Sequence, residues 1–175
     1  MKLSPILAVA VLSLLMLFDP GSAHISLAQE ASNSTETYGA WMVRCKREKE
    51  LNLCEMLQTL GTGTGKDRKI VAQVAIGRLP NAKTPRAVLQ VPMGVDLTRP
   101  PVLVIGETAE YSGRYFICTG RFCRAEIELP ADVTGEIDKA KKASMRFVLL
   151  GKNIVVLITA DGMAKAFKAA LGKAS

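Results

Sequence analysis

Short apolar runs separated by turn residues are the feature that most constrains the fold of this chain. Between residues 38 and 158 the sequence contains runs of four to eight residues, rich in valine and isoleucine and bounded by glycine, proline and asparagine. Such runs are typical of β-strands, because branched side chains pack well on a pleated surface. We expect nine strands, at residues 38–45, 53–60, 69–76, 86–91, 102–105, 114–118, 123–129, 145–150 and 153–158.

Two further segments have helical patterns. Residues 131–143 follow a proline and combine alanine with polar residues, and residues 162–171 place Met163, Phe167 and Leu171 on one face. Many strands with two short helices, one of them C-terminal, predict an all-β fold, a two-sheet β-sandwich. No repeat or linker divides residues 38–175, which we expect to form one domain after a flexible polar lead at residues 29–37.

The first 28 residues have the pattern of a secretory signal. Lys2 precedes an uncharged apolar run of 13 residues, and Asp19-Pro20-Gly21 ends that run. Small residues permit cleavage after Ala23 or after Ala28, and both sites stay open. The run is shorter than the roughly 20 residues that span a bilayer. We therefore expect an exported protein with no transmembrane span after cleavage, in the periplasm or associated with the outer membrane or cell surface.

All four cysteines lie after the predicted signal. An even number in an exported chain indicates disulfides. The local pairing Cys45–Cys54 and Cys118–Cys123 is favoured, because each bond closes a hairpin between residues close in sequence. A pairing between the two halves, such as Cys45–Cys118 with Cys54–Cys123, stays open. The spacings are poor for a zinc site, and four residues between Cys118 and Cys123 favour a structural bond over a redox-active dithiol.

The histidine count argues against most catalytic sites. The one histidine, His24, lies within or beside the cleavage region, and a chain without it has no Ser-His-Asp triad, Cys-His pair or histidine metal site. The glycine-rich segment 61–66 does not match a phosphate loop, because Leu60 and Asp67 occupy the positions of the required glycine and hydroxyl residue. We predict a protein that is not an enzyme, with no catalytic residues, cofactor or metal.

The formal net charge is +7, and the predicted signal does not change it. A cationic surface attracts anionic partners such as lipid headgroups, lipopolysaccharide phosphates or host polyanions, although a merely solvated basic surface explains the charge equally well. Nucleic acid is not an expected partner, since few aromatic residues are present to stack on bases. The candidate contacts for an anionic partner are Arg44, Lys46, Arg47, Lys49, Arg121 and Arg124.

Several motifs occur in a fixed order along the chain. They are Tyr38-Gly39-Ala40-Trp41 before Cys45, Cys54-Glu55-Met56-Leu57-Gln58, Val91-Pro92-Met93-Gly94-Val95-Asp96-Leu97, Tyr115-Phe116-Ile117-Cys118 with Cys123-Arg124-Ala125, and Phe167-Lys168-Ala169-Ala170-Leu171. This order resembles the bacterial invasion-associated locus B family. The resemblance implies an exported, immunoglobulin-like β-sandwich linked to host-cell invasion, and it supplies no active-site residues. Thr98-Arg99-Pro100-Pro101 replaces the glycine-containing turn expected after Leu97, so we expect that loop to differ in shape.

These patterns together give a functional hypothesis. The chain is expected to be a non-enzymatic, exported cell-envelope protein that takes part in host-cell invasion by binding a macromolecule, either at the host-cell surface or in the anionic envelope. The alternative is a periplasmic accessory or chaperone-like module that maintains the envelope. The sequence does not predict an oligomeric state.

Overall fold

The computed structural model describes residues 33–62, 66 and 69–174. The predicted signal at residues 1–28 and the start of the lead lie outside the described residues. The described elements, in chain order, are β1 (Ser34–Tyr38), β2 (Trp41–Glu48), β3 (Leu51–Thr62), β4 (Lys69–Gly77), β5 (Arg86–Pro92), β6 (Val102–Ile105), β7 (Ala109–Ser112), β8 (Arg114–Thr119), β9 (Phe122–Glu128), α1 (Val133–Lys139), β10 (Ala143–Leu149), β11 (Lys152–Ile158) and α2 (Met163–Lys173).

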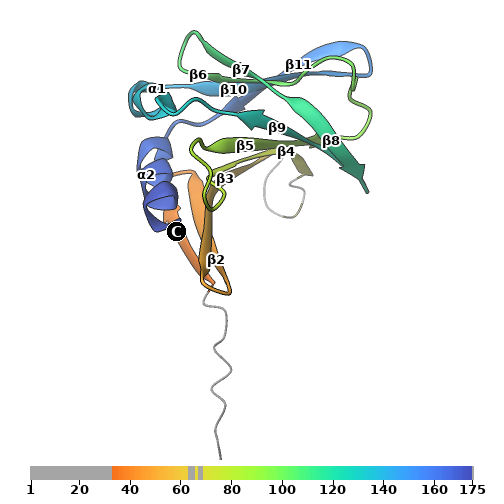
Figure 1. Ribbon diagram of the computed structural model, residues 1–175. Helices are drawn as coiled ribbons and strands as arrows, with labels where there is room; N and C mark the ends of the chain where they lie inside the picture. The colour runs from red at the N-terminus through yellow and green to blue at the C-terminus, as the bar shows by residue number, and fades with distance from the viewer. Residues whose placement is uncertain (1–32, 63–65, 67–68, 175) are drawn as a thin grey trace, which may run out of the picture.

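The strands form two antiparallel sheets, which confirms the predicted all-β sandwich with a C-terminal helix. One sheet has seven strands in the order β1-β2-β3-β4-β5-β9-β8, and the other has four in the order β11-β10-β6-β7. Figure 1 shows the four-stranded sheet over one half of the larger sheet and α2 beside the half that contains β2 and β3. The inner face of the large sheet is therefore covered by two different layers, and its outer face carries neither.

Alternating burial along the strands creates these two faces. In β2, Trp41, Val43 and Cys45 are buried, whereas the residues between them are exposed. Successive side chains of a strand point to opposite faces, so the apolar set packs inward and the charged set points outward. The C-terminal helix follows its predicted pattern, with Met163 and Phe167 buried against the sheet.

A buried polar contact joins the large sheet to the segment that leads into α2. The Trp41 indole Nε1 donates to the Thr159 carbonyl at 2.9 Å. The Gln58 side chain, which is buried, donates to the same carbonyl at 3.2 Å and accepts from the Thr159 N–H at 3.0 Å. Because buried amides are stable only when they are hydrogen bonded, these contacts fix the connection between β11 and α2. The tryptophan and glutamine of the sequence motifs therefore have structural roles.

Gly162 allows the same connection to pass close to the turn between β1 and β2. It adopts a φ of +78°, and a Cβ placed on it would lie 1.9 Å from the Tyr38 carbonyl oxygen. Only glycine combines this left-handed backbone with so close an approach. Farther along α2, the Asn52 side chain donates to the Lys173 carbonyl at 2.7 Å, and the Lys173 ammonium pairs with Glu36 of β1. The hydrogen bond from Lys173 lowers the pKa of Glu36.

The structure corrects three details of the sequence predictions. Ser34–Tyr38 forms strand β1, although we expected a flexible lead as far as residue 37, and Ala109–Ser112 forms the short strand β7. Neither segment contains an apolar run from which a strand could be predicted. Both form strands because their backbones pair with a neighbouring strand at a sheet edge. The first helix ends at Lys139 instead of residue 143, where β10 already begins.

Candidate functional site

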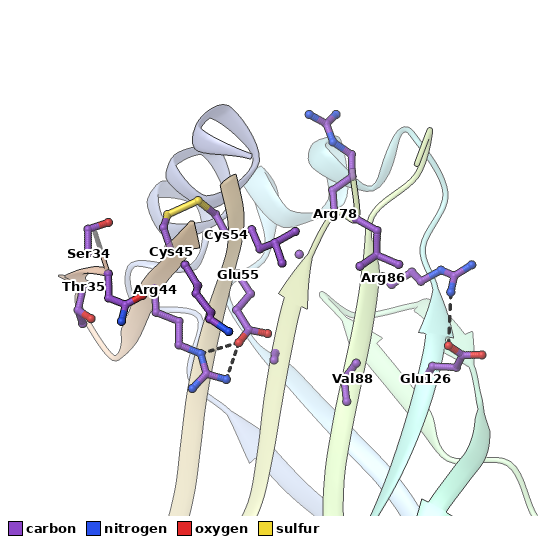
Figure 2. Close-up of a pocket in the computed structure, with 16 residues that line it drawn as sticks. Ser34, Thr35, Arg44, Cys45, Cys54, Glu55, Arg78, Arg86, Val88 and Glu126 are labelled. Atoms are coloured by element: carbon purple, nitrogen blue, oxygen red, sulfur yellow. Dashed lines mark hydrogen bonds and ion pairs between the residues drawn. A yellow bond between two sulfur atoms is a disulfide. The ribbon is translucent and has the colours of Figure 1, made fainter. Parts of the chain in front are cut away.

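A groove crosses the outer face of the seven-stranded sheet. It has a volume of about 660 Å³ and is lined by residues of β1, β2, β3, β4, β5 and β9 and by the segment that follows β4 (Figure 2). A volume of this size lies in the range of roughly 300–1,000 Å³ typical of ligand sites.

Small residues form the floor of the groove. Ala75 and Gly77 occupy the outward positions of the central strand β4, and Val88 lies opposite Ala75 on β5. A Cβ on Gly77 would lie 2.8 Å from the Cys54 carbonyl oxygen, so a side chain at this position requires the neighbouring strand to move. The surface is hollow above Gly77 because Glu55 and Arg86, the residues opposite it on β3 and β5, have long side chains.

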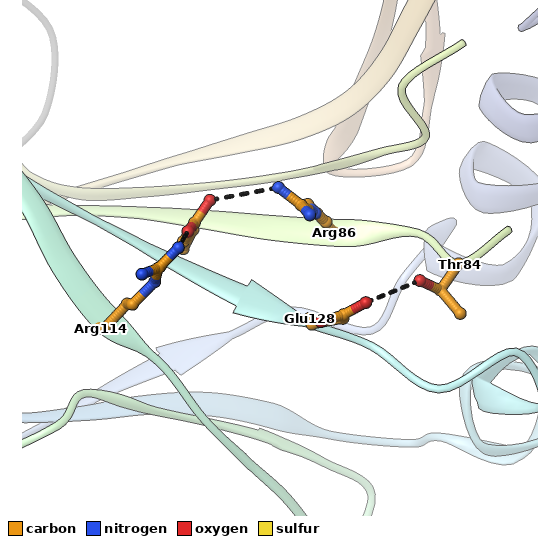
Figure 3. Close-up of polar contacts among 5 residues, drawn as sticks. Thr84, Arg86, Arg114 and Glu128 are labelled. Carbon is orange, nitrogen blue, oxygen red and sulfur yellow. Dashed lines mark hydrogen bonds and ion pairs between the residues drawn. The ribbon is translucent and has the colours of Figure 1, made fainter. Parts of the chain in front are cut away.

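Charged pairs form the two walls. On one side, Arg44 of β2 is hydrogen bonded to Glu55, the residue directly opposite on β3. On the other side, Glu126 of β9 accepts from Arg114 Nε at 2.9 Å and lies 3.5 Å from a guanidinium nitrogen of Arg86 (Figures 2 and 3). The walls therefore present guanidinium groups on both sides of an apolar floor.

The carboxylates in this region are already engaged. Glu126 forms ion pairs with Arg86 and Arg114, and Glu128 accepts a hydrogen bond from the Thr84 hydroxyl at 3.2 Å (Figure 3). Lys46, which also lines the groove, pairs with Glu48 at 2.6 Å. Exposed ion pairs contribute only about 0.2–1 kcal/mol. An anionic ligand can therefore replace these carboxylates as the partner of Arg86 or Lys46 at little cost.

The structure distributes the six basic residues predicted as contacts over two ends of the sheet. Arg44 and Lys46 line the groove, and Arg47 and Lys49 are exposed at the nearby end of the β2–β3 hairpin. Arg121 lies in the β8–β9 turn, at the opposite ends of the strands. Arg124 of β9 donates a hydrogen bond to the Gln90 side chain at 3.3 Å. The six residues therefore do not form one cluster.

The sequence prediction missed Arg86 and the acidic residues of the groove. Arg86 is one strand from Gly77 and two strands from Glu55 in the sheet, yet it follows Glu55 by more than thirty positions in sequence. Glu126 and Glu128 are two positions apart on β9 and therefore lie on the same face of the strand. The partners across the sheet could be identified only from the strand register.

Both disulfides join residues that lie directly opposite in a hairpin. Cys45 of β2 is bonded to Cys54 of β3, and Cys118 of β8 to Cys123 of β9. This is the local pairing favoured on the sequence. Both bonds lie within the large sheet, and disulfides of this kind fit a protein exported into an oxidising compartment.

Two further properties concern the part of the chain that the structure describes. Within residues 33–62, 66 and 69–174 no three side chains of histidine, cysteine, aspartate or glutamate are arranged to hold a metal ion. No helix in the same ranges has the length and apolar character needed to cross a membrane.

Comparison with known proteins gives one consistent result. Residues 41–171 match the family described as invasion associated locus B (IalB) protein. Two curated proteins of Brucella abortus, the invasion protein B homologues of strains 2308 and 9-941, are each 30% identical over 109 residues. That match covers 61% of this chain and spans 60% of the length of each relative.

A solved structure supports the fold. The crystal structure of invasion associated protein B from Bartonella henselae superimposes with a TM-score of 0.65 at 17% sequence identity, covering 76% of this chain and 91% of that one. The family match covers all strands from β2 to β11 and most of α2. The chain belongs to the invasion associated locus B family.

Proposed function

We propose that this protein is exported and acts where a bacterium contacts a host cell, by binding a polyanion in the groove on the outer face of the seven-stranded sheet. The names of the Brucella and Bartonella relatives support a role in invasion. The groove supports binding as the mode of action.

The observation that carries the proposal is the combination of cationic walls with an apolar floor. Arg44, Lys46 and Arg86 line one open hollow that has Ala75 and Val88 beneath them. Guanidinium groups bind carboxylate, phosphate or sulfate with two parallel hydrogen bonds, and apolar contact adds affinity for the backbone that carries those anions. Anionic polysaccharides at cell surfaces have this chemistry.

Retention on immobilised heparin, a sulfated polysaccharide, tests the groove. The variant K46E/R86E reverses two charges that line it and removes only exposed ion pairs, so the fold is expected to persist. We expect this variant to bind heparin roughly tenfold more weakly and to elute at lower salt, since the attraction is electrostatic.

The matched control is K139E/K141E, which makes the same change in net charge at exposed lysines in and next to α1, outside the groove. It should elute close to the unmodified protein. An equal loss of heparin binding in both variants would show that net charge, and not the groove, determines the affinity. Unchanged heparin binding by K46E/R86E would contradict the proposal. In the latter case an envelope defect on gene deletion, without a defect in host contact, would favour the periplasmic accessory role.

A further inference from the structure

A second surface lies where three connections meet at one end of the sandwich. The loop after β5 donates from Met93 N–H to the Arg121 carbonyl in the β8–β9 turn at 2.9 Å. The β10–β11 turn donates from Leu150 N–H to the Gly94 carbonyl at 3.1 Å, and Val95 forms a β-bridge with Leu149. These backbone contacts hold the three connections as one unit, toward the right of Figure 1.

Large apolar side chains project from this unit into solvent. Leu150 is 80% exposed, Leu97 59% and Met93 51%, whereas Val95 between them is buried. A Cβ on Gly94 would lie 3.3 Å from Leu150 Cδ2, so Leu150 extends over the loop that carries Met93. We name Met93, Leu97 and Leu150 the apolar tip.

The backbone at Leu150 is itself unusual. Leu150 and Gly151 have φ angles of 49° and 76°, which places both in the left-handed region. Two-residue hairpin turns of this type favour Asn-Gly, because a leucine with positive φ is strained. Residues held in such conformations are concentrated at functional sites. The strained backbone position of this turn is therefore also the position of its most exposed apolar side chain, Leu150.

Positive charges surround the apolar tip. Arg99, Arg121 and Lys152 are exposed on its three connections. Asp96 is the one carboxylate within residues 93–99, 119–122 and 149–152, and it accepts hydrogen bonds from the Thr98 N–H at 3.0 Å and the Thr98 hydroxyl at 2.6 Å. Exposed apolar side chains flanked by cations match the two layers of an anionic lipid surface, acyl chains below and phosphates above.

We infer that the apolar tip inserts into the headgroup region of an anionic membrane, with Arg99, Arg121 and Lys152 contacting lipid phosphates. This inference does not depend on the groove, which opens on the outer face of the sheet and is lined by none of these residues. It assigns a membrane-facing end to the molecule and leaves the groove exposed for another partner.

Sedimentation with lipid vesicles tests the inference. The protein should bind vesicles of equal parts phosphatidylglycerol and phosphatidylcholine and should bind much less to phosphatidylcholine alone. The variant M93S/L150S should bind the anionic vesicles at least about tenfold more weakly, because it loses the side chains that enter the lipid. K46E/R86E and K139E/K141E, which carry the same net charge, should bind them equally, which separates this site from the groove.

The matched control is L157S, because Leu157 is 77% exposed on β11, in the strand and away from the turn. It should retain full vesicle binding. Both serine variants replace exposed side chains, so thermal melting is expected to show intact folds. A second readout uses L150W, whose fluorescence should shift to the blue with anionic vesicles, while the native Trp41 is buried throughout.

Three results would overturn the inference: vesicle binding by M93S/L150S at the unmodified level, an equal loss in L157S, or no binding of the unmodified protein to anionic vesicles. Crosslinking at Leu150 to a protein in the absence of vesicle binding would assign the apolar tip to a protein partner instead.

Discussion

At the residue scale, the side chains that hold this fold together act through partners far away in sequence. Trp41 and Gln58 both reach Thr159, at separations of 118 and 101 residues. The sequence identified Trp41 and Gln58 as motif members but not their roles, because their partner is a backbone group with no sequence signal. Burial could be predicted from alternation, whereas the hydrogen bonds that satisfy buried groups depend on the three-dimensional path of the chain.

Tyr115 gives a prediction at this scale. Burial raises the pKa of Tyr115 to about 12, with a smaller contribution from the Asp96 carboxylate. Its buried hydroxyl has no hydrogen-bond partner among the described residues, and such a group costs roughly 1–3 kcal/mol. We expect Y115F to raise the free energy of unfolding by about 1 kcal/mol, as measured by urea denaturation at neutral pH.

The same variant has a pH signature. The raised pKa means that the folded state holds the Tyr115 proton more tightly than the unfolded state, so this contribution is complete below pH 10 and is lost as the pH rises toward about 12. Stability between those values should fall less steeply for Y115F than for the unmodified protein. Parallel stability curves for the two proteins, or a less stable Y115F at neutral pH, would contradict this account.

At the element scale, hairpins account for most of what the sequence predicted correctly. Strands with alternating apolar residues were found, and the cysteine pairing followed from the shortest loops. The two strands that were missed, β1 and β7, carry polar or short sequences and exist because a neighbouring strand offers unpaired backbone groups. Because these strands depend on pairing with a neighbouring strand, their own amino-acid composition does not predict them.

The two disulfides differ in accessibility, which gives a prediction for these elements. Cys45, Cys54 and Cys123 are buried, whereas Cys118 is exposed at the edge strand β8. Because thiol–disulfide exchange requires access to a sulfur, mild reductant should open Cys118–Cys123 before Cys45–Cys54. Alkylation followed by peptide mass mapping should first modify Cys118 and Cys123. Simultaneous modification of all four cysteines, or earlier modification of Cys45, would show that exposure does not control the order.

Of the two disulfides, Cys45–Cys54 should contribute more to the free energy of unfolding. Closing a loop of about ten residues contributes roughly 2.7 kcal/mol on the chain-entropy account, so loss of the Cys45–Cys54 bond should lower the free energy of unfolding by about that amount. The β2–β3 hairpin that this bond closes also carries Arg44 and Lys46.

At the scale of the whole molecule, the seven-stranded sheet has different environments on its two sides. The four-stranded sheet and α2 divide its inner face, and the outer face holds the groove. The sandwich was predictable from the strand count and alternation. The groove was not, because it depends on a register that places Ala75 and Gly77 between longer residues of the two neighbouring strands, β3 and β5. Of the six basic residues predicted from the sequence as contacts, only Arg44 and Lys46 line the groove.

The most direct measurement for the central claim is the binding of labelled protein to cultured mammalian cells. The unmodified protein, K46E/R86E and K139E/K141E are compared at physiological salt, with heparin as competitor. We predict that K46E/R86E loses most of its binding, that K139E/K141E retains it, and that heparin displaces the unmodified protein. Equal binding by all three proteins, undisturbed by heparin, would contradict the assignment of the groove as the binding site for a host-surface polyanion.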